Sequence, residues 1–467
     1  MNSSIFKAYD IRGIYPTDIN ELDVYKIATA TCQFLKKENP SEENFSLVIG
    51  CDVRLSSPQL KRAALKAATD QKIKVIDIGN ISTDMLYFAV AEYGYTGGFT
   101  ITASHNPKEY NGMKIVRRGG QPISSDTGLF EIRDMVEKIE INSDVLNEDA
   151  DQNFIEKKAI LEEYAQKVRS FADFSNLKKL KFVANPNFGV GGVALDKITE
   201  KLDLEIIKLN YEPDGNFPKG RPDPLIHENQ KEISQLVVEH GADFGVAWDA
   251  DADRCFFFTE KGQFIEGYFI TALLARIFLA KNKGEKIVHD TRLTWAIEDT
   301  IKQLEGIDVP NKAGHSFMKE RMYKEKAILG GEMSAHYFFR DYYFCDCGMI
   351  PFVMMLDFLS NQEKTFSEIM QELFWHKYFV SGEINSAVAD VPATVEKIKA
   401  LYIEKATKID EQDGISLDFT NEENPASNWR FSVRASNTEP LIRLNVEATS
   451  QTTMEQKRDE LLNLIRN

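Results

Sequence analysis

One pattern occurs three times along this chain: an apolar strand, a polar turn, an amphipathic helix and a second strand. Such a unit is typical of two parallel strands joined by a crossover helix, so the sequence predicts three α/β segments. The predicted strand pairs are residues 46–50 with 74–78, 181–184 with 204–209, and 286–289 with 307–309.

The last part of the chain has a different pattern. Residues 429–434 and 441–447 are predicted strands around a polar tip, and a polar amphipathic helix is predicted from Thr453, which indicates an α+β segment. The length of 467 residues suits about three domains of ordinary size. We place the domains at residues 1–150, 151–258, 259–365 and 366–467.

Charge and composition limit the partners. The net charge is -16, and no run of Lys or Arg offers a face to a phosphate backbone, which argues against nucleic-acid binding. We find no signal peptide and no apolar stretch of about 18 residues, so we expect a cytoplasmic protein without a membrane partner. The five cysteines are scattered and odd in number, which fits reduced thiols.

Two polar segments suggest phosphoryl transfer. Residues 102–107 (TASHNP) place the Ser104 hydroxyl beside an imidazole, although the same residue types also favour an ordinary turn. Asp249, Asp251 and Asp253 alternate with alanines, and in extended backbone they project to one side, where their repulsion calls for a divalent cation such as Mg²⁺. A calcium loop is the alternative, but Arg254 stands where that loop needs glycine.

Two later segments suit a phosphorylated sugar. Glu332, Ser334 and His336 alternate, so in extended backbone they face one way toward sugar hydroxyls; an ordinary strand edge has the same spacing. Arg434 begins a predicted hairpin tip that combines an arginine with hydroxyls and backbone N–H groups, a suitable nest for an anion, although a plain polar hairpin would have a similar sequence.

In this order the signals resemble the α-D-phosphohexomutase family, and the resemblance covers essentially the whole chain. Its motifs are residues 6–13 (FKAYDIRG), 102–107, 249–254, 314–319 (GHSFMK), 331–334 (GEMS) and 434–438 (RASNT). Met333 and residues 331–349 and 381–385 look like the bacterial phosphomannomutases that feed GDP-mannose synthesis. The resemblance implies three related α/β domains and a C-terminal α+β domain around a central cleft.

The resemblance also implies roles for individual residues. Ser104 would carry the phosphoryl group, Mg²⁺ would be held by Ser104 and the three aspartates, and a hexose 1,6-bisphosphate would activate the enzyme. Arg254 would orient the phosphoserine, and the candidates for proton transfer, which the sequence does not rank, are Arg12, His105, Lys114 and His336. Substrate binding falls to Tyr9, Arg292, His315, Glu332, Ser334, Arg434, Ser436, Asn437 and Thr438.

Several questions stay open at this point. Ala250 stands where the family usually has glycine, which would strain the metal loop if that position needs a positive φ. The substrate could be mannose phosphate alone or both mannose and glucose phosphates. A magnesium-dependent sugar phosphatase and a silent sugar-phosphate binding protein are further alternatives, and the chain could be a monomer or a homodimer.

Overall fold

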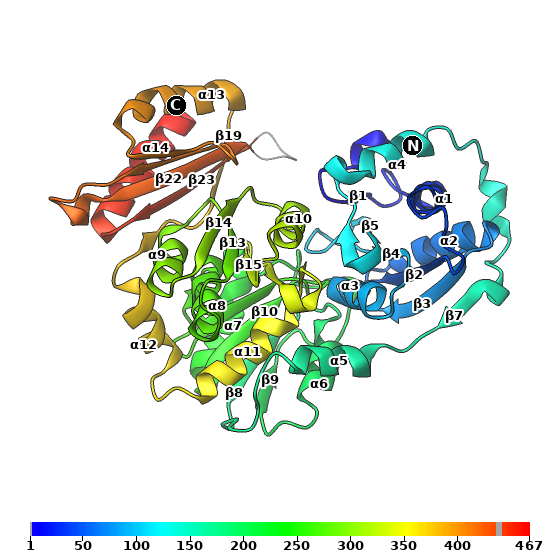
Figure 1. Cartoon of the computed structure of the whole chain (residues 1–467), viewed down its shortest axis with the longest axis horizontal. Helices are drawn as coiled ribbons and strands as arrows, with labels where there is room; N and C mark the ends of the chain where they lie inside the picture. The colour runs from blue at the N-terminus through cyan, green and yellow to red at the C-terminus, as the bar shows by residue number, and fades with distance from the viewer. Residues whose placement is uncertain (1, 436–440) are drawn as a thin grey trace. The chain divides into compact units, whose positions relative to one another are not determined.

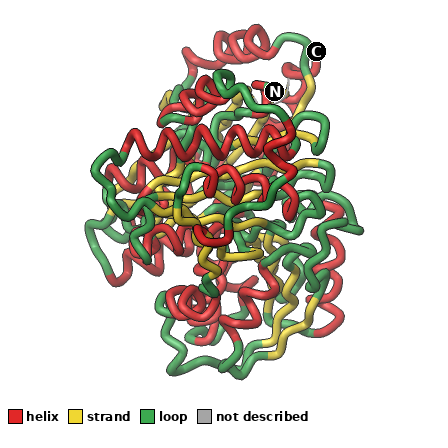
Figure 2. Tube along the Cα trace, turned by 90° about the vertical axis from the view of Figure 1, so that its right-hand side faces the viewer, coloured by secondary structure: helices red, strands yellow, loops and turns green. Residues whose placement is uncertain are grey.

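The computed structural model describes residues 2–435 and 441–467. The chain divides into two compact units. The first unit contains residues 1–264 and 341–363, and the second contains residues 265–340 and 364–467. Figure 1 shows the chain in colour order, and Figure 2 shows helices lying over the strands of its sheets. Among the described helices, none has the length and apolar character needed to span a membrane.

The first unit begins with a seven-stranded mixed sheet in the order β1-β5-β4-β2-β3-β7, with β6 on β5. β2 runs parallel to both β3 and β4, as the predicted strand–helix–strand unit requires. Apolar side chains from the strands and the first two long helices form its core. The elements are β1 (Ile11–Ile14), α1 (Glu21–Glu38), β2 (Ser46–Cys51), α2 (Ser57–Asp70), β3 (Lys74–Asn80), α3 (Thr83–Glu92), β4 (Gly97–Ile101), β5 (Tyr110–Arg117), β6 (Gln121–Pro122), α4 (Leu129–Val136) and β7 (Ile155–Lys157).

The second sheet has the order β12-β11-β10-β8-β9, and β12 (Phe264–Ile265) lies where the first part of this unit ends. β8 is parallel to β9 and β10, whereas β10 and β11 form an antiparallel hairpin. This hairpin carries the three aspartates in its connection. The elements are α5 (Leu161–Arg169), β8 (Lys181–Asn185), α6 (Gly191–Thr199), β9 (Glu205–Lys208), α7 (His227–His240), β10 (Phe244–Trp248), β11 (Cys255–Thr259) and α11 (Met349–Ser360).

The second unit begins with a sheet in the order β14-β13-β15-β16, in which β13 is parallel to β14 and β15. The third predicted strand–helix–strand unit is therefore confirmed. The elements are α8 (Gly267–Lys281), β13 (Lys286–Asp290), α9 (Trp295–Gln303), β14 (Ile307–Asn311), α10 (His315–Glu325), β15 (Leu329–Gly331), β16 (Tyr337–Phe339) and α12 (Phe366–Met370).

The C-terminal sheet is antiparallel, in the order β18-β23-β22-β21-β20 with β19 on β23. Apolar residues of both α13 and α14 join the strand side chains in one core, so the two helices cover the same face (Figure 1). The elements are β18 (Phe379–Val380), β19 (Ile384–Ala387), α13 (Val391–Tyr402), β20 (Lys408–Asp410), β21 (Ile415–Phe419), β22 (Trp429–Ala435), β23 (Leu441–Ala448) and α14 (Gln451–Arg466).

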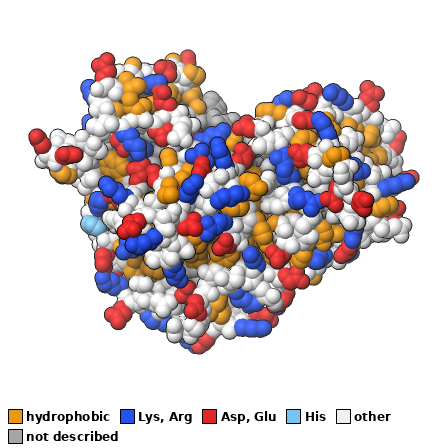
Figure 3. All heavy atoms as spheres, in the orientation of Figure 1, with side chains coloured by type: hydrophobic (Ala, Val, Ile, Leu, Met, Phe, Trp, Pro, Cys, Tyr) orange, Lys and Arg blue, Asp and Glu red, His pale blue; other side chains and the backbone are white. Residues whose placement is uncertain are grey.

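Charged side chains of both signs are interspersed on the face shown in Figure 3, and basic residues do not gather into one large patch on that face. Because the net charge is -16, local groups of basic residues must supply any positive field that binds an anion.

Candidate active site

Ser104 lies in the turn that follows β4, and its backbone is left-handed, with φ 48°. Its N–H donates to Thr102 Oγ1 at 2.9 Å, which helps to hold the turn. The Ser104 hydroxyl donates to Asp249 Oδ2 at 2.9 Å and lies 3.2 Å from Nδ1 of His105. The structure thus places the predicted nucleophile beside both a carboxylate of the metal loop and an imidazole.

Arg54, which was not among the predicted site residues, organises this turn. Its side chain is fully buried, and its Nε donates to Asp52 Oδ2 at 3.1 Å. Its two terminal nitrogens donate to four backbone carbonyls, those of Ser104 (2.6 Å), Asn106 (2.8 Å), Pro107 (2.7 Å) and Tyr110 (3.0 Å). The acceptors lie about fifty residues further along the chain, so no local motif indicates them.

The three metal-loop carboxylates converge, but not for the predicted reason. The connection between β10 and β11 is a turn rather than extended backbone: Ala252 N donates to Asp249 O at 3.0 Å, and Ala252 has φ 54°. One oxygen from each of Asp249, Asp251 and Asp253 still lies within 4.8 Å of the others. Ala250, where the family usually has glycine, does not have a positive φ and is not strained. The positive φ in this turn is at Ala252.

Lys114 of β5 neutralises part of this carboxylate cluster. Its ammonium donates to Asp251 Oδ2 at 2.7 Å and to Asp253 Oδ2 at 2.5 Å. Burial alone would lower the pKa of Lys114, but the two carboxylates raise it overall. Asp251 also accepts from the Thr83 hydroxyl at 2.5 Å, while its Oδ1 is buried without a hydrogen-bond partner among the described residues. Carboxylate oxygens of this kind suit a hard divalent cation, so the residues present fit Mg²⁺.

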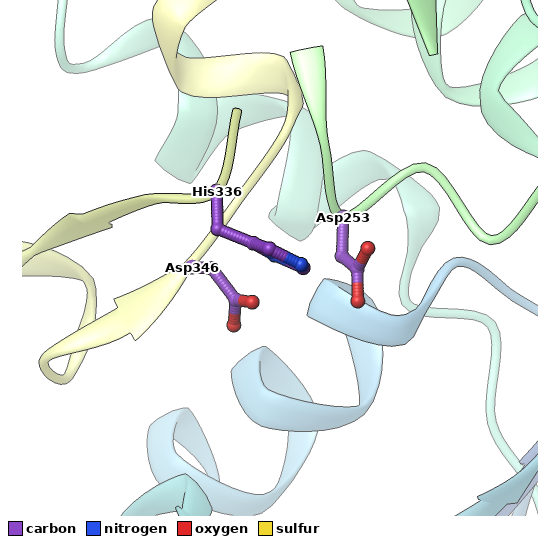
Figure 4. A group of neighbouring side chains, drawn as sticks. All are labelled: Asp253, His336 and Asp346. Atoms are coloured by element: carbon purple, nitrogen blue, oxygen red, sulfur yellow. The ribbon is translucent and has the colours of Figure 1, made fainter. Parts of the chain in front are cut away.

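A further carboxylate lies next to the metal loop. Asp346, in β17 (Cys345–Asp346), is fully buried, and one of its oxygens lies within 4.8 Å of one of Asp253. Figure 4 shows the two side chains reaching this position from different segments. Trp248 Nε1 donates to Gly348 O at 2.9 Å and fastens the Asp346 segment to the end of β10. Asp346 was not among the predicted site residues, because it follows a cysteine in no recognised metal spacing.

Arg12 contacts the serine turn from β1. It donates to Asp10 Oδ2 at 2.8 Å, to Ala103 O at 3.0 Å and to the Asn106 side chain. Burial alone would lower the pKa of Arg12, but the nearby carboxylates, Asp10 first, raise it. Tyr9, predicted to bind substrate, is half-buried and directly precedes Asp10.

Arg254 binds the same carboxylate oxygen as the Ser104 hydroxyl. Its Nε donates to Asp249 Oδ2 at 2.9 Å, and its Nη2, 3.7 Å from an Asp223 oxygen, is buried without a hydrogen bond among the described residues. Burial, together with the charges of Arg254 and Arg12, lowers the pKa of His105 well below its usual value. The surroundings of Ser104 therefore combine a neutral imidazole with cationic groups that suit a phosphoserine.

In the second unit, Arg292 follows β13 and is held by carboxylates. Its Nη2 donates to Asp290 Oδ2 at 2.7 Å and lies 3.9 Å from an oxygen of Glu332. Gly314 N donates to Glu332 Oε1 at 2.7 Å, whereas Glu332 Oε2 is buried without a partner among the described residues. A buried carboxylate with an unused oxygen is suited to accept from a sugar hydroxyl.

The predicted sugar loop is a tight turn rather than extended backbone. Ala335 N donates to Glu332 O at 2.9 Å, and Ala335 has φ 66°, so alternation does not set the directions of these side chains. Ser334 is half-buried in the turn, and His336 directly precedes β16. The His336 ring stacks at 5.7 Å from that of His315, the first residue of α10. The structure therefore groups His315 with the sugar loop.

Three arginines of this unit share one carboxylate. Arg434 of β22, Arg443 of β23 and Arg292 each donate to Glu383, all at 3.3 Å. Arg443 and the Glu383 contact were missed by the sequence analysis, which noted residues 381–385 only for their resemblance. The other predicted members of the anion nest, Ser436, Asn437 and Thr438, lie outside the described residues.

Two residues of the C-terminal sheet hydrogen-bond to the backbone of the loop that carries Arg292. Arg430 of β22 donates to Arg292 O at 2.9 Å and to Thr291 O at 3.1 Å. Glu447 of β23 accepts from the backbone N–H groups of Thr294 at 3.1 Å and Trp295 at 3.3 Å. Strands of the C-terminal sheet therefore supply Arg434 and also set the position of Arg292.

Four family models match in the expected order. They are described as phosphoglucomutase/phosphomannomutase alpha/beta/alpha domains I, II and III, over residues 3–143, 162–262 and 266–378, and the C-terminal domain of that family, over residues 383–464. The chain belongs to the phosphoglucomutase/phosphomannomutase family. The predicted architecture of three α/β domains and a C-terminal α+β domain is confirmed, while the boundaries placed near residues 150, 258 and 365 stay predictions.

Individual members of the family match over almost their whole length. A phosphomannomutase of Vibrio cholerae is 43% identical over 470 residues, which cover 99% of this chain and 98% of the relative. A protein named phosphohexose mutases, from Xanthomonas campestris pv. campestris, is 43% identical over 469 residues and all of both chains. The crystal structure of a phosphoglucomutase/phosphomannomutase family protein from Burkholderia thailandensis has a TM-score of 0.84 at 26% identity and covers 99% of this chain and 97% of its own.

Proposed function

We propose that this chain is a phosphomannomutase that interconverts mannose 6-phosphate and mannose 1-phosphate through a phosphorylated Ser104 and a 1,6-bisphosphate. The observation that carries the proposal is the 2.9 Å contact between Ser104 Oγ and Asp249 within the group of three aspartates. The similarity to phosphomannomutases over the full length supports the choice of sugar.

In the first half-reaction, O6 of mannose 1-phosphate attacks the phosphorus on Ser104. The bond between phosphorus and Ser104 Oγ breaks, and the proton of the sugar hydroxyl passes to a base. Arg12 and Arg254, each next to the serine turn or its carboxylate partner, bind the phosphoryl oxygens. In the second half-reaction Ser104 Oγ attacks the phosphorus at O1 and loses its proton to a base. The bond between that phosphorus and O1 breaks, O1 takes up a proton, and mannose 6-phosphate is released.

The proton acceptor remains one of Arg12, His105, Lys114 and His336. Among them, His105 is a neutral imidazole with Nδ1 3.2 Å from the serine oxygen, so it can accept a proton without first losing one. Lys114 donates to two carboxylates and is a cation in that environment.

The metal and the activator belong to the same proposal. Asp249, Asp251, Asp253 and an oxygen on Ser104 would hold Mg²⁺, which when bound neutralises charge on the transferred phosphoryl group. A hexose 1,6-bisphosphate would prime Ser104 by donating one of its phosphoryl groups.

Residues of the second unit bind the sugar phosphate in this proposal. Arg292 and Arg434 bind the phosphate, and Glu332, whose Oε2 has no other described partner, accepts from a ring hydroxyl. The remaining predicted contributors are Tyr9 of the first unit and Ser334, His315, Ser436, Asn437 and Thr438 of the second.

The test compares kcat/KM for mannose 1-phosphate and glucose 1-phosphate, with Mg²⁺ and a trace of hexose 1,6-bisphosphate, while released inorganic phosphate is measured in parallel. A strong preference for mannose supports the proposal. Comparable values would instead support a dual-specificity enzyme, an alternative favoured by the name of the Xanthomonas relative. Release of phosphate without isomerisation would indicate a phosphatase.

A further inference from the structure

Glu383 occupies an unusual place, because it is an anion at the centre of a group of cations expected to bind an anion. The carboxylate lies just before β19, after Gly382, whose φ of 65° suits glycine. Arg292 and Arg434 donate to its Oε2, and Arg443 donates to its Oε1. We name Arg292, Arg434 and Arg443 the arginine triad.

All three contacts are 3.3 Å long, whereas charge-assisted N–H···O bonds have a usual length of about 2.7–2.9 Å. One carboxylate thus contacts three guanidinium groups at long distances, and a second carboxylate, that of Asp413, lies 3.7 Å from Arg434 Nη1. By contrast, Arg292 binds Asp290 at 2.7 Å, so the site can form short bonds where the geometry allows them. The Glu383 side chain is 20% exposed, and hence a ligand from solvent can reach it.

Burial alone would raise the pKa of Glu383, but the arginine triad lowers it overall, so the carboxylate is ionised at neutral pH. An ionised carboxylate and a phosphate dianion require the same donors and repel each other at short range. Glu383 also lies near Glu266, a half-buried carboxylate whose pKa is raised by desolvation and by the charge of Glu383.

We propose that Glu383 is a positioning residue that competes with the phosphoryl group of the substrate for the arginine triad and thereby limits how tightly the triad binds phosphate. The inference rests on the proposed function, which supplies the phosphorylated sugar. In that reaction a bisphosphate must present each of its two phosphates in turn, so a triad that held one phosphate very tightly would slow the exchange. A carboxylate that replaces the departing phosphate oxygens lowers the barrier to release.

The test measures binding of radiolabelled inorganic phosphate to the full chain by equilibrium dialysis. Glu383→Gln removes the charge and keeps an oxygen acceptor, and we expect it to lower the Kd for phosphate by about tenfold at low salt, as expected when one like charge a few ångströms from a dianion is removed in a water-like dielectric. The gain should shrink as salt is added. In turnover, Glu383→Gln should lower both KM and kcat.

Two variants serve as controls. Glu423→Gln removes the same charge from an exposed turn of the same unit and should leave the Kd unchanged. Arg434→Ala, added to Glu383→Gln, should abolish the gain, which assigns it to the triad rather than to the arginines around Ser104. An unchanged or weaker phosphate affinity in Glu383→Gln would overturn the proposal, because a carboxylate that only organises the arginines predicts that result. Tighter phosphate binding by Glu383→Gln, together with no mutase turnover by the wild type, would instead reject the proposed function and keep the competition.

Discussion

Replacement of Arg54 by lysine tests the organisation of the nucleophile most directly. Lysine keeps the positive charge, but its ammonium offers only three donors, whereas the guanidinium makes five hydrogen bonds to Asp52 and four carbonyls. At least two of the acceptors therefore lose the bond that the buried guanidinium makes to them. Of the five, Asp52 Oδ2 keeps a second donor in Thr102 Oγ1. Pro107 O keeps a second donor in Tyr110 N.

The size of the effect follows from these lost bonds. The loss of one such charge-assisted hydrogen bond costs about 1–3 kcal/mol, so Arg54→Lys, which loses at least two, should destabilise the first unit by about 2–6 kcal/mol. For a unit of this size the lower figure corresponds to a decrease in Tm of about 4–8 °C. Circular dichroism during heating measures the decrease.

The substitution should also lower kcat, independently of its effect on stability. Ser104 has φ 48°, a conformation that costs a non-glycine residue roughly 1–2 kcal/mol and that Arg54 helps to hold through Ser104 O. Relaxation of this turn would displace the hydroxyl from Asp249, and a displacement of about 1 Å can reduce the rate about 100-fold. We expect kcat to fall by that factor at temperatures where the protein is folded, with little change in the substrate KM.

The control is Arg62→Lys in α2. Arg62 and its partner Asp149 are both exposed, with 60% and 80% of their side-chain surface accessible, so this exchange should change stability by less than about 0.5 kcal/mol. An Arg54→Lys variant with unchanged Tm and with kcat within about threefold of the wild type would refute the role assigned to Arg54.

Three shorter predictions concern the nucleophile, the metal and pH. Ser104→Ala should lose phosphorylation by hexose 1,6-bisphosphate, read by mass spectrometry, and mutase activity while keeping its Tm; near wild-type turnover would reject the nucleophile. Mg²⁺ at about 100 times its Kd should stabilise the wild type by about 2.7 kcal/mol, and Asp251→Asn should lose most of this gain, whereas an equal gain would exclude Asp251 as a ligand. Burial raises the pKa of Glu447 from 4.5 to about 7, so its favourable contribution is present at acid pH and is lost as pH rises through 7. The Tm of the wild type should therefore fall relative to that of Glu447→Gln between about pH 5 and pH 8; a constant difference would contradict the assigned shift.

The periodic elements were predictable because their signal is local. Residues 46–50 and 74–78 alternate or run apolar as buried strands do, and the intervening helix shows its own spacing, so β2, α2 and β3 follow from neighbouring residues. The same holds for the strands β22 and β23.

The loops were predicted less well, since extended geometry was assumed where a turn exists. Alternating aspartates suggested a strand, yet Ala252 at φ 54° closes a turn, and Ala335 does the same in the sugar loop at φ 66°. The grouping of the side chains was right in the first case because the turn, rather than the alternation, gathers the carboxylates.

The residues missed altogether act over long sequence separations. Arg54 binds carbonyls 50 to 56 residues away, and Glu383 meets Arg292 across 91 residues. A single arginine after a strand, or a glutamate before one, carries no local signal of such a partner. Only the assembled fold brings these groups together.

The two sets of site residues each pack three like charges around one opposite charge, and the signs are reversed between the two sets. In the first unit, the ammonium of Lys114 already contacts two of the three carboxylates expected to hold a cation. In the second unit, the carboxylate of Glu383 already contacts the three guanidinium groups of the arginine triad, which are expected to hold a phosphate. Like charges packed this closely in a buried site would repel by several kcal/mol without a counter-charge. Each unit therefore supplies a side chain whose charge has the same sign as that of the expected ligand. This side chain keeps the site folded, and the ligand must replace it when it binds. Removal of the Lys114 charge should therefore destabilise the first site and raise its affinity for a cation, and removal of the Glu383 charge should do the same for the second site and phosphate. Loss of an ordinary ion pair destabilises a protein without raising its affinity for a ligand.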